Sequence, residues 1–303
     1  MLGWRMIGAL TAILIVGSAA SAQSIPANNP HPVRVDVDLV LVNASVTDSE
    51  NRPVLGLQEK NFILWENKIQ QSIESFSSEE IALSAGIVLD LSGSMKSDER
   101  MARGALASFL ARSSQQDEYF LMTFSDRAEI AHEYTADIAQ LQSSVFLRPV
   151  RGKTALFDAL YLAIEKLKEA RNPKKVLLLI TDGEDNHSRH SLSDVLQRVK
   201  ELDIQIYAVG FVPFGAWKLG RGQAVLEELA QWTGGKAFFP SNADKIEEIC
   251  SVIAEEIKSQ YVLTYISTDS RREGKWRDIR VKVEPPAGSH RLTVRAKRGY
   301  YGP

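Results

Sequence analysis

The chain has 303 residues, 36 basic against 38 acidic side chains for a formal net charge of −2, 44% hydrophobic residues and one cysteine. This near-neutral charge gives no electrostatic reason to expect binding to nucleic acid or to an anionic membrane. A single cysteine excludes an intramolecular disulfide and every metal centre that needs several cysteines. The length predicts about two domains, and the composition predicts that hydrophobic cores stabilise them.

The first 22 residues have the composition of a secretory signal peptide. Arg5 precedes an apolar run over 6–16, and small residues follow up to Ala22. We expect cleavage after Ala22, a mature protein that is periplasmic or secreted, and no membrane insertion after cleavage. The alternative is an uncleaved anchor, but the apolar run is shorter than the ~20 residues that span a bilayer. Residues 23–33, rich in Pro and Asn, predict a linker.

Residues 34–80 predict an N-terminal β segment, because apolar and polar side chains alternate with a period of two. The runs 62–65 and 69–76 flank Glu66-Asn67-Lys68, which predicts a hairpin. Residues 261–303 show the same period and predict a C-terminal β segment. We expect its strands at 261–266, 279–283 and 292–296, the first two joined as an exposed hairpin through a charged turn.

Residues 81–260 predict an α/β domain, because buried strands alternate with amphipathic helices. Strands are expected at 85–89, 119–124, 129–132, 175–180, 204–209 and 237–239. Helices are expected after Ser97, after Thr154, over 191–202 with a capping box, over 225–232 and over 244–259. Cys250 lies on the apolar stripe of the last helix, where it would act as a small hydrophobe.

The fold class that follows is α/β, with a doubly wound, mostly parallel sheet in the central domain. Neither β segment is long enough for a stable sandwich of its own. We therefore predict that the N- and C-terminal segments pair into one β-sandwich, with the α/β domain inserted between them.

Two strands of the central domain end in carboxylates. Asp90 ends the first strand and is followed by Ser92 and Ser94, and Asp182 follows the most apolar strand. Ligands of doubly wound sheets bind beyond the carboxyl ends of strands where the winding reverses, and the hydroxyl of Thr154 starts a helix nearby. Oxygen ligands without imidazole or thiolate favour a hard cation, Mg²⁺ or Mn²⁺.

Each of these residues also has a structural interpretation. Thr154 could be a helix N-cap, and Ser92 and Ser94 could bond their own backbone in a turn. Two carboxylates at one crevice are harder to explain without a cation, because like charges repel. His187 and His190, three residues apart, allow a second metal site but are more typical of a solvated loop.

Asp90-x-Ser92-x-Ser94, then Thr154, then Asp182, resembles the metal-ion-dependent adhesion site (MIDAS) of von Willebrand factor A (VWFA) domains. In that family the three hydroxyls would bind the metal directly, the two carboxylates would act mostly through water, and a partner's carboxylate would complete the coordination. The segments around 46–62 and 295–301 also resemble a secreted, VWFA-related bacterial group of the acidobacterial type.

The loops beyond Asp182 and after the strand at 204–209 are candidates for a partner-binding rim. Glu184 and Asp185 follow the second metal carboxylate, and Phe214 and Trp217 lie in a Gly- and Pro-containing loop. Exposed aromatic side chains at the end of a strand suit a protein interface.

The resemblance implies a non-enzymatic, metal-dependent protein-binding module of the adhesion type, whose Mg²⁺ or Mn²⁺ coordinates an Asp or Glu of a protein partner. Two alternatives are a metal-dependent hydrolase and a cell-envelope assembly protein with a structural metal. The hydrolase needs a general base or nucleophile, and the sequence offers only Asp90, Asp182 and Glu184 near the metal. We therefore predict no enzymatic activity.

Overall fold

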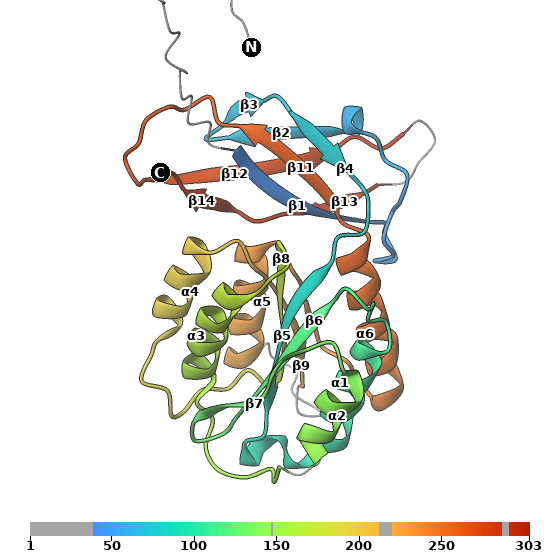
Figure 1. Cartoon of the computed structure of the whole chain (residues 1–303), viewed down its shortest axis with the longest axis vertical. Helices are drawn as coiled ribbons and strands as arrows, with labels where there is room; N and C mark the ends of the chain where they lie inside the picture. The colour runs from blue at the N-terminus through green and yellow to red at the C-terminus, as the bar shows by residue number, and fades with distance from the viewer. Residues whose placement is uncertain (1–38, 147, 212–219, 287–290) are drawn as a thin grey trace, which may run out of the picture. The chain divides into compact units, whose positions relative to one another are not determined.

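In the computed structural model, residues 39–146, 148–211, 220–286 and 291–303 are described. The α/β domain is built on a six-stranded sheet of order β10-β9-β8-β5-β6-β7, in which only β7 is antiparallel (Figure 1). Its strands are β5 (Leu83–Asp90), β6 (Glu118–Phe124), β7 (Ala128–Thr135), β8 (Lys174–Thr181), β9 (Gln205–Gly210) and β10 (Ala237–Phe238). The predicted doubly wound, mostly parallel sheet is confirmed.

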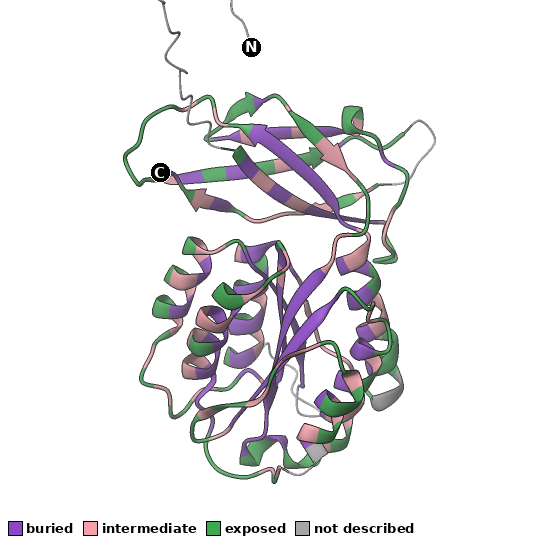
Figure 2. Ribbon diagram, viewed as in Figure 1, coloured by how far each residue is buried: buried purple, intermediate pink, exposed green. Residues whose placement is uncertain are grey.

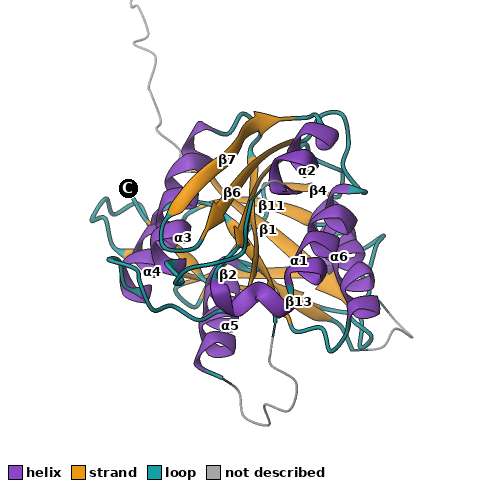
Figure 3. Cartoon of the chain, turned by 90° about the horizontal axis from the view of Figure 1, so that it is seen from below, coloured by secondary structure: helices purple, strands orange, loops and turns teal. Residues whose placement is uncertain are grey.

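Helices cover both faces of this sheet, which explains the continuous apolar runs of its central strands. All residues of β5, β6 and β9 are buried, and so is every residue of β8 except the half-buried Lys175 (Figure 2). One face packs against α1 (Glu99–Leu110), α2 (Ile138–Phe146) and α6 (Ala243–Lys258). The other packs against α3 (Leu156–Lys166), α4 (Leu192–Glu201) and α5 (Arg221–Thr233). Figure 3 shows the two helical layers on either side of the strands.

The α6 prediction is confirmed in detail. Cys250 is fully buried with Ile246 and Ile253 in the core cluster, and burial raises the pKa of its thiol to about 12. The capping box of α4 also forms, with Ser191 accepting from the Asp194 amide.

Three predictions about helices were wrong or incomplete. Ser97 does not cap α1, because Gly93–Ser97 forms its own 3-10 turn (η2) that buries Met95, and Asp98 takes the N-cap position. Thr154 does not open α3, which begins at Leu156 after Ala155. The helix α2 was not predicted, since its short apolar stripe rests mainly on Leu141 and Val145.

The N- and C-terminal segments form two four-stranded sheets, ordered β13-β1-β11-β4 and β14-β12-β2-β3. The N-terminal strands are β1 (Leu39–Thr47), β2 (Phe62–Glu66), β3 (Ile69–Gln71) and β4 (Ser75–Ser77), with a 3-10 turn, η1 (Glu59–Asn61). The C-terminal strands are β11 (Tyr261–Ile266), β12 (Trp276–Val283), β13 (Thr293–Arg295) and β14 (Gly299–Tyr301). Each sheet therefore takes strands from both ends of the chain, and their apolar side chains share one buried cluster.

Two predicted hairpins differ from the structure. The β2–β3 hairpin forms around Asn67 and Lys68, both with positive φ as a tight hairpin turn requires, but its second arm stops at Gln71 and β4 joins the other sheet. The strands β11 and β12 do not pair at all, because they belong to different sheets. The charges around their connection are likewise not all exposed, since Arg277 is buried.

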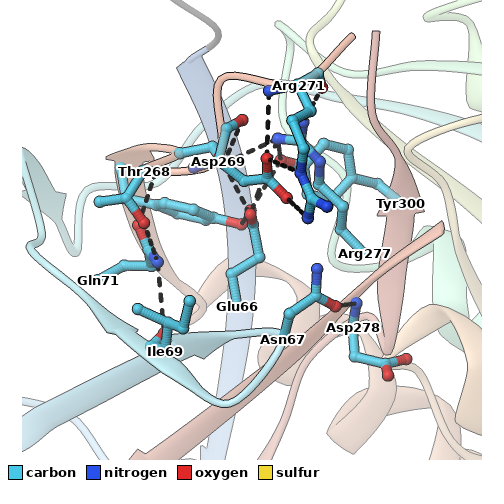
Figure 4. A network of polar contacts seen from close by, with 12 residues as sticks. Glu66, Asn67, Ile69, Gln71, Thr268, Asp269, Arg271, Arg277, Asp278 and Tyr300 are labelled. Carbon is cyan, nitrogen blue, oxygen red and sulfur yellow. Dashed lines mark hydrogen bonds and ion pairs between the residues drawn. The ribbon is translucent and has the colours of Figure 1, made fainter. Parts of the chain in front are cut away.

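A buried polar network centred on Glu66 links strands of both sheets (Figure 4). The Glu66 carboxylate is 2% exposed and accepts hydrogen bonds from the hydroxyls of Tyr265 (2.7 Å), Tyr300 (2.8 Å) and Ser267 (2.7 Å). The Arg277 guanidinium, 4% exposed, lies 3.7 Å from the carboxylate and donates to the Ser267 hydroxyl at 2.8 Å. In this network the positive charge of Arg277 compensates the buried negative charge of Glu66. Its hydrogen bonds also hold strands of the two sheets in position relative to each other.

Removing one partner of this network should destabilise the protein strongly. Arg277→Ala leaves the Glu66 carboxylate buried without its counter-charge, so we expect a loss of about 3 kcal/mol in the free energy of unfolding, measured by urea denaturation. Arg280→Ala, on the exposed face of the same strand, is the matched control and should cost less than about 1 kcal/mol. Equal losses in the two variants would show that the buried pair contributes nothing specific.

Candidate metal centre

The predicted crevice lies at the carboxyl ends of β5 and β8, at the foot of the sheet in Figure 1. These strands are parallel neighbours, paired from Leu83 and Lys174 to Leu89 and Ile180. The chain runs from β5 to β6 on one side and returns to β8 on the other, so the winding reverses between them. The expectation that Asp90 and Asp182 end neighbouring strands is confirmed, and a reversal of this kind is where ligands of open α/β sheets bind.

Backbone hydrogen bonds tie the loop after β5 to the loop before α3. The Gly93 amide donates to the Gly152 carbonyl (2.9 Å), and the Arg151 amide donates to the Leu91 carbonyl (2.8 Å). Gly152 has a φ of +92°, in the left-handed region that favours glycine, and a Cβ there would come within 2.6 Å of the Asp126 carboxylate in the turn between β6 and β7, so a larger residue would strain this backbone and displace the Asp126 side chain. The segment with Ser92 and Ser94 is thereby held beside the segment with Thr154.

The loop after β8 is joined to the same place through Thr154. Its carbonyl accepts from the amides of Asn186 and His187, both at 3.0 Å, and its amide donates to the Asn186 Oδ1 at 2.9 Å. Asp182 opens this loop, is half-buried and accepts from the Glu184 amide at 3.0 Å. The structure thus gathers the loops that carry all five predicted metal residues.

Asp90 is the most unusual of the five, because its carboxyl is 1% exposed. Its Oδ1 accepts from the Ser92 amide at 2.8 Å and its Oδ2 from the Thr181 hydroxyl at 2.6 Å. Burial raises the pKa of Asp90 to about 6; hydrogen bonds from Thr181 and Ser92 oppose this, and the charge of Asp182 adds to it. Within the described ranges no basic side chain forms an ion pair with Asp90.

The three hydroxyls are not used to cap the backbone. The Ser92 and Ser94 hydroxyls lie 3.0 Å apart and bond each other, and Ser92 precedes η2 without a side-chain capping bond. Thr154 is 2% exposed and precedes the N-cap Ala155, so its interpretation as an N-cap was wrong. In the part of the chain that the structure describes, its hydroxyl forms no hydrogen bond. These hydroxyls remain available to a ligand.

This donor set fits a hard divalent cation. It combines a buried carboxylate without a counter-charge, a second carboxylate and three hydroxyls, with no imidazole or thiolate. Two carboxylates are too few for a site made of acids and histidines, and no cluster of three or more His, Cys, Asp or Glu suited to a metal occurs among the described residues. A cation here would depend on hydroxyls and water for its remaining ligands.

Of the four predicted rim residues, the structure describes Glu184 and Asp185. Glu184 is exposed, as a rim residue must be. Asp185 is half-buried and engaged, because its Oδ1 accepts from the Ser188 hydroxyl (2.5 Å) and from the Phe157 amide (3.3 Å) at the start of α3. Phe214 and Trp217 lie outside the described residues.

The two histidines after Asp182 do not act together. The His190 ring stacks on Tyr161 with centroids 4.1 Å apart, and its Nδ1 lies 2.6 Å from the Asp158 carboxylate. His187 is exposed, and its amide binds the Thr154 carbonyl. The pair is therefore explained by the packing of its loop.

Sequence reasoning missed the residues that position the site. Thr181 donates to Asp90, and Asn186 connects the second and third loops. The polar Thr181 at the end of an otherwise apolar run was the available signal for the first. Nothing local marks Asn186, because its role depends on a contact 32 residues away in the chain.

The six-stranded sheet with helices on both faces has the fold of a von Willebrand factor type A domain. Residues 86–252, more than half of the chain, match the family profile described as "von Willebrand factor type A domain", and the chain belongs to this family. A comparison with curated proteins found no match.

Solved structures share the fold at low sequence identity. A von Willebrand factor type A protein from Catenulispora acidiphila is similar with a TM-score of 0.52 and 13% identity, over 88% of this chain and 74% of that one. Proximal thread matrix protein 1 from the mussel byssus is similar with a TM-score of 0.52 and 18% identity, over 64% of this chain and 51% of that one. A further structure of the mussel protein, described as having a zinc-occupied MIDAS motif, has a TM-score of 0.51 and 18% identity, over 63% and 49%.

The buried carboxyl predicts a specific pH dependence of stability in the absence of a divalent cation. A carboxyl with a raised pKa binds its proton more tightly in the folded state, so its favourable contribution is complete below about pH 4 and lost by about pH 6. At neutral pH the ionised Asp90 then costs about 3 kcal/mol.

We therefore expect Asp90→Asn to raise the Tm in EDTA at pH 7.5 by roughly 5–10 °C and to leave it unchanged at pH 4. The amide keeps an oxygen for Ser92, and the Thr181 hydroxyl can turn to accept from its nitrogen. Glu247→Gln, at an exposed site on α6, is the control and should match the wild type at both pH values. A lower Tm for Asp90→Asn at pH 7.5 would contradict this account of the site.

Proposed function

We propose that this protein is a non-enzymatic, divalent-metal-dependent binding module of the adhesion type. The cation is held by Ser92, Ser94 and Thr154, with Asp90 and Asp182 supplying negative charge. The observation that supports the proposal is that backbone hydrogen bonds join the loops carrying these three hydroxyls at the strand end where the buried carboxylate of Asp90 lacks a counter-charge. Mg²⁺ or Mn²⁺ suits these ligands best.

The cation would give the site its affinity for an acidic partner. With so few charged protein ligands, Mg²⁺ keeps water molecules and leaves at least one position that a carboxylate can take. A bound cation is also the largest local charge in such a site and attracts an Asp or Glu on a protein partner. The partner class that follows is a protein that presents an acidic side chain at an accessible position.

Hydrolysis is the weaker alternative because the site offers no suitable base. Asp90 is buried and bonded to Ser92 and Thr181, and Asp182 stands at the metal. The neighbouring imidazole of His190 is held by Asp158 and Tyr161. Glu184 and His187 are exposed on the same loop, but general base catalysis needs a group placed within hydrogen-bond reach of the attacking water.

The location proposed for this activity is the periplasm or the extracellular space, following signal cleavage after Ala22. In the described part of the chain, no helix is both long and apolar enough to span a membrane. The α/β domain would then meet its partner outside the cytoplasm.

The two four-stranded sheets are proposed to be the layers of one β-sandwich that carries the α/β domain. Support comes from strand order, since each sheet combines N- and C-terminal strands, and from the shared cluster around Leu64, Leu263 and Ile279. The network of Glu66 with Tyr265 and Arg277 adds polar contacts inside it.

Calorimetric titration of residues 23–303 with Mg²⁺, Mn²⁺ and Zn²⁺ tests the metal site. We expect saturable binding in the millimolar range or tighter, lost in Asp90→Ala and in Asp182→Ala, because each change removes one of only two carboxylates. Both variants should stay folded, since relief of charge repulsion offsets lost hydrogen bonds. Glu247→Gln is the control and should bind like the wild type.

Three outcomes would contradict the proposed function. Folded wild type without saturable binding of any of the three cations would remove its basis. Magnesium-dependent turnover of p-nitrophenyl phosphate that is lost in Asp90→Ala would favour the hydrolase. Partner capture unchanged by EDTA would favour an assembly protein whose metal, if any, is structural.

A further inference from the structure

A groove runs beside the metal-site loops, with a volume of about 420 Å³. One wall is the turn between β6 and β7, from Ser125 to Arg127, and the other is the segment from Arg148 to Arg151. Its floor includes the buried side chains of Leu91 and Phe124. None of the five predicted metal residues lines it, so it is a separate feature of the same edge.

The groove and the metal site share their loops. Leu91 stands between Asp90 and Ser92 in the chain, and Arg151 is three residues before Thr154. The Arg151 amide donates to the Leu91 carbonyl, which fixes the second wall to the floor of the groove. Because an extended chain advances by ~3.3 Å per residue, a partner segment held at the metal reaches this groove within a few residues.

The side chains that line the groove carry more positive than negative charge. Glu129 is shared by two arginines, with Arg127 at 2.9 Å and Arg148 at 3.0 Å, and their hydrogen bonds hold the pKa of its carboxyl below its ordinary value. Asp126 accepts from the Lys153 amide at 2.8 Å. The groove therefore contains three guanidinium groups and two carboxylates, both of which already have partners.

Arg151 is the guanidinium of this groove for which the structure shows no carboxylate partner among the described residues. Its side chain is exposed and, among the residues that the structure describes, forms no hydrogen bond or ion pair. Lys153, two residues further along the chain, is exposed as well. A guanidinium in a groove is suited to a carboxylate, which it can bind through two parallel hydrogen bonds.

We propose that this groove is the second contact of the partner site: it binds an acidic side chain that flanks the carboxylate held by the metal, and Arg151 determines this specificity. The partner is then a protein segment with at least two acidic residues a few positions apart in extended conformation. This inference rests on the proposed function, because the metal-bound carboxylate places the segment along the groove.

The test uses two fluorescein-labelled peptides and residues 23–303. One peptide has an aspartate followed by three glutamates, and the other has glutamines in place of the glutamates. Fluorescence anisotropy is measured in millimolar Mg²⁺ and in EDTA for the wild type, Arg151→Gln and Arg151→Glu. Lys60→Gln, an exposed position in the N-terminal β segment, is the matched control.

In Mg²⁺ the glutamate peptide should bind more tightly than the glutamine peptide. Arg151→Gln should weaken the glutamate peptide roughly threefold and Arg151→Glu by more, with little effect on the glutamine peptide and with the difference reduced at high salt. The control should bind both peptides like the wild type.

Two further results separate the ways in which this account can fail. If both peptides bind in a magnesium-dependent way with equal affinity, or if Arg151→Gln weakens both equally, the groove is not an acid-binding contact, while the metal-dependent function stands. If neither peptide binds the wild type better in Mg²⁺ than in EDTA, the proposed function fails, and the groove loses the anchor on which its role depends.

Discussion

A buried carboxylate without a counter-charge is the constraint on which the rest of the site depends. Asp90 ends the central strand β5, is 1% exposed, and meets hydroxyl and amide donors but no basic side chain in the described residues. Its pKa near 6 records the cost of this arrangement. Such a group is costly unless it is neutralised, and a cation that enters from the open edge of the sheet removes the cost.

Backbone hydrogen bonds hold the surrounding loops together at that edge of the sheet. Thr154 binds the loop after β8 through its backbone, so its side chain is left for a ligand. A Cβ at Gly93 would lie 3.1 Å from the Gly152 carbonyl oxygen, so glycine at position 93 lets the loop after β5 approach the loop before α3. Because backbone groups make these contacts, the loops are held in place without capping bonds from the hydroxyls. Loops that are already ordered lower the entropic cost of binding a ligand.

The sequence predicted the α/β domain well, for reasons of burial. A strand that is covered on both faces is a continuous run of apolar residues, and a helix that is covered on one face carries a stripe of apolar residues. Both patterns can be recognised within a short stretch of sequence. The same logic placed Cys250 in the core and Asp90 and Asp182 at neighbouring strand ends. The positions of Asp90, Ser92 and Asp182 at this edge were predictable because they lie at fixed offsets from the ends of those strands.

What was not predictable depended on contacts between distant segments. We predicted a hairpin of β11 and β12 because these strands are adjacent in the chain. In the structure β11 pairs with β1 and β12 pairs with β2. Ser97 and Thr154 were both predicted to cap helices, but Ser97 belongs to η2, and the N-cap positions of α1 and α3 are taken by Asp98 and Ala155. Asp185 read as an accessible rim residue, whereas the structure engages it with Ser188 and Phe157.

The most direct test of the account is to locate the cation. Crystals of residues 23–303 soaked in Mn²⁺ give an anomalous difference map in which the ion is seen without assumptions about its ligands. The account predicts one strong peak in the crevice beyond β5 and β8, within bonding distance of the hydroxyls of Ser92, Ser94 and Thr154. A well-ordered crevice without a peak, or a peak bound by other residues such as Glu184 and His187, would contradict it.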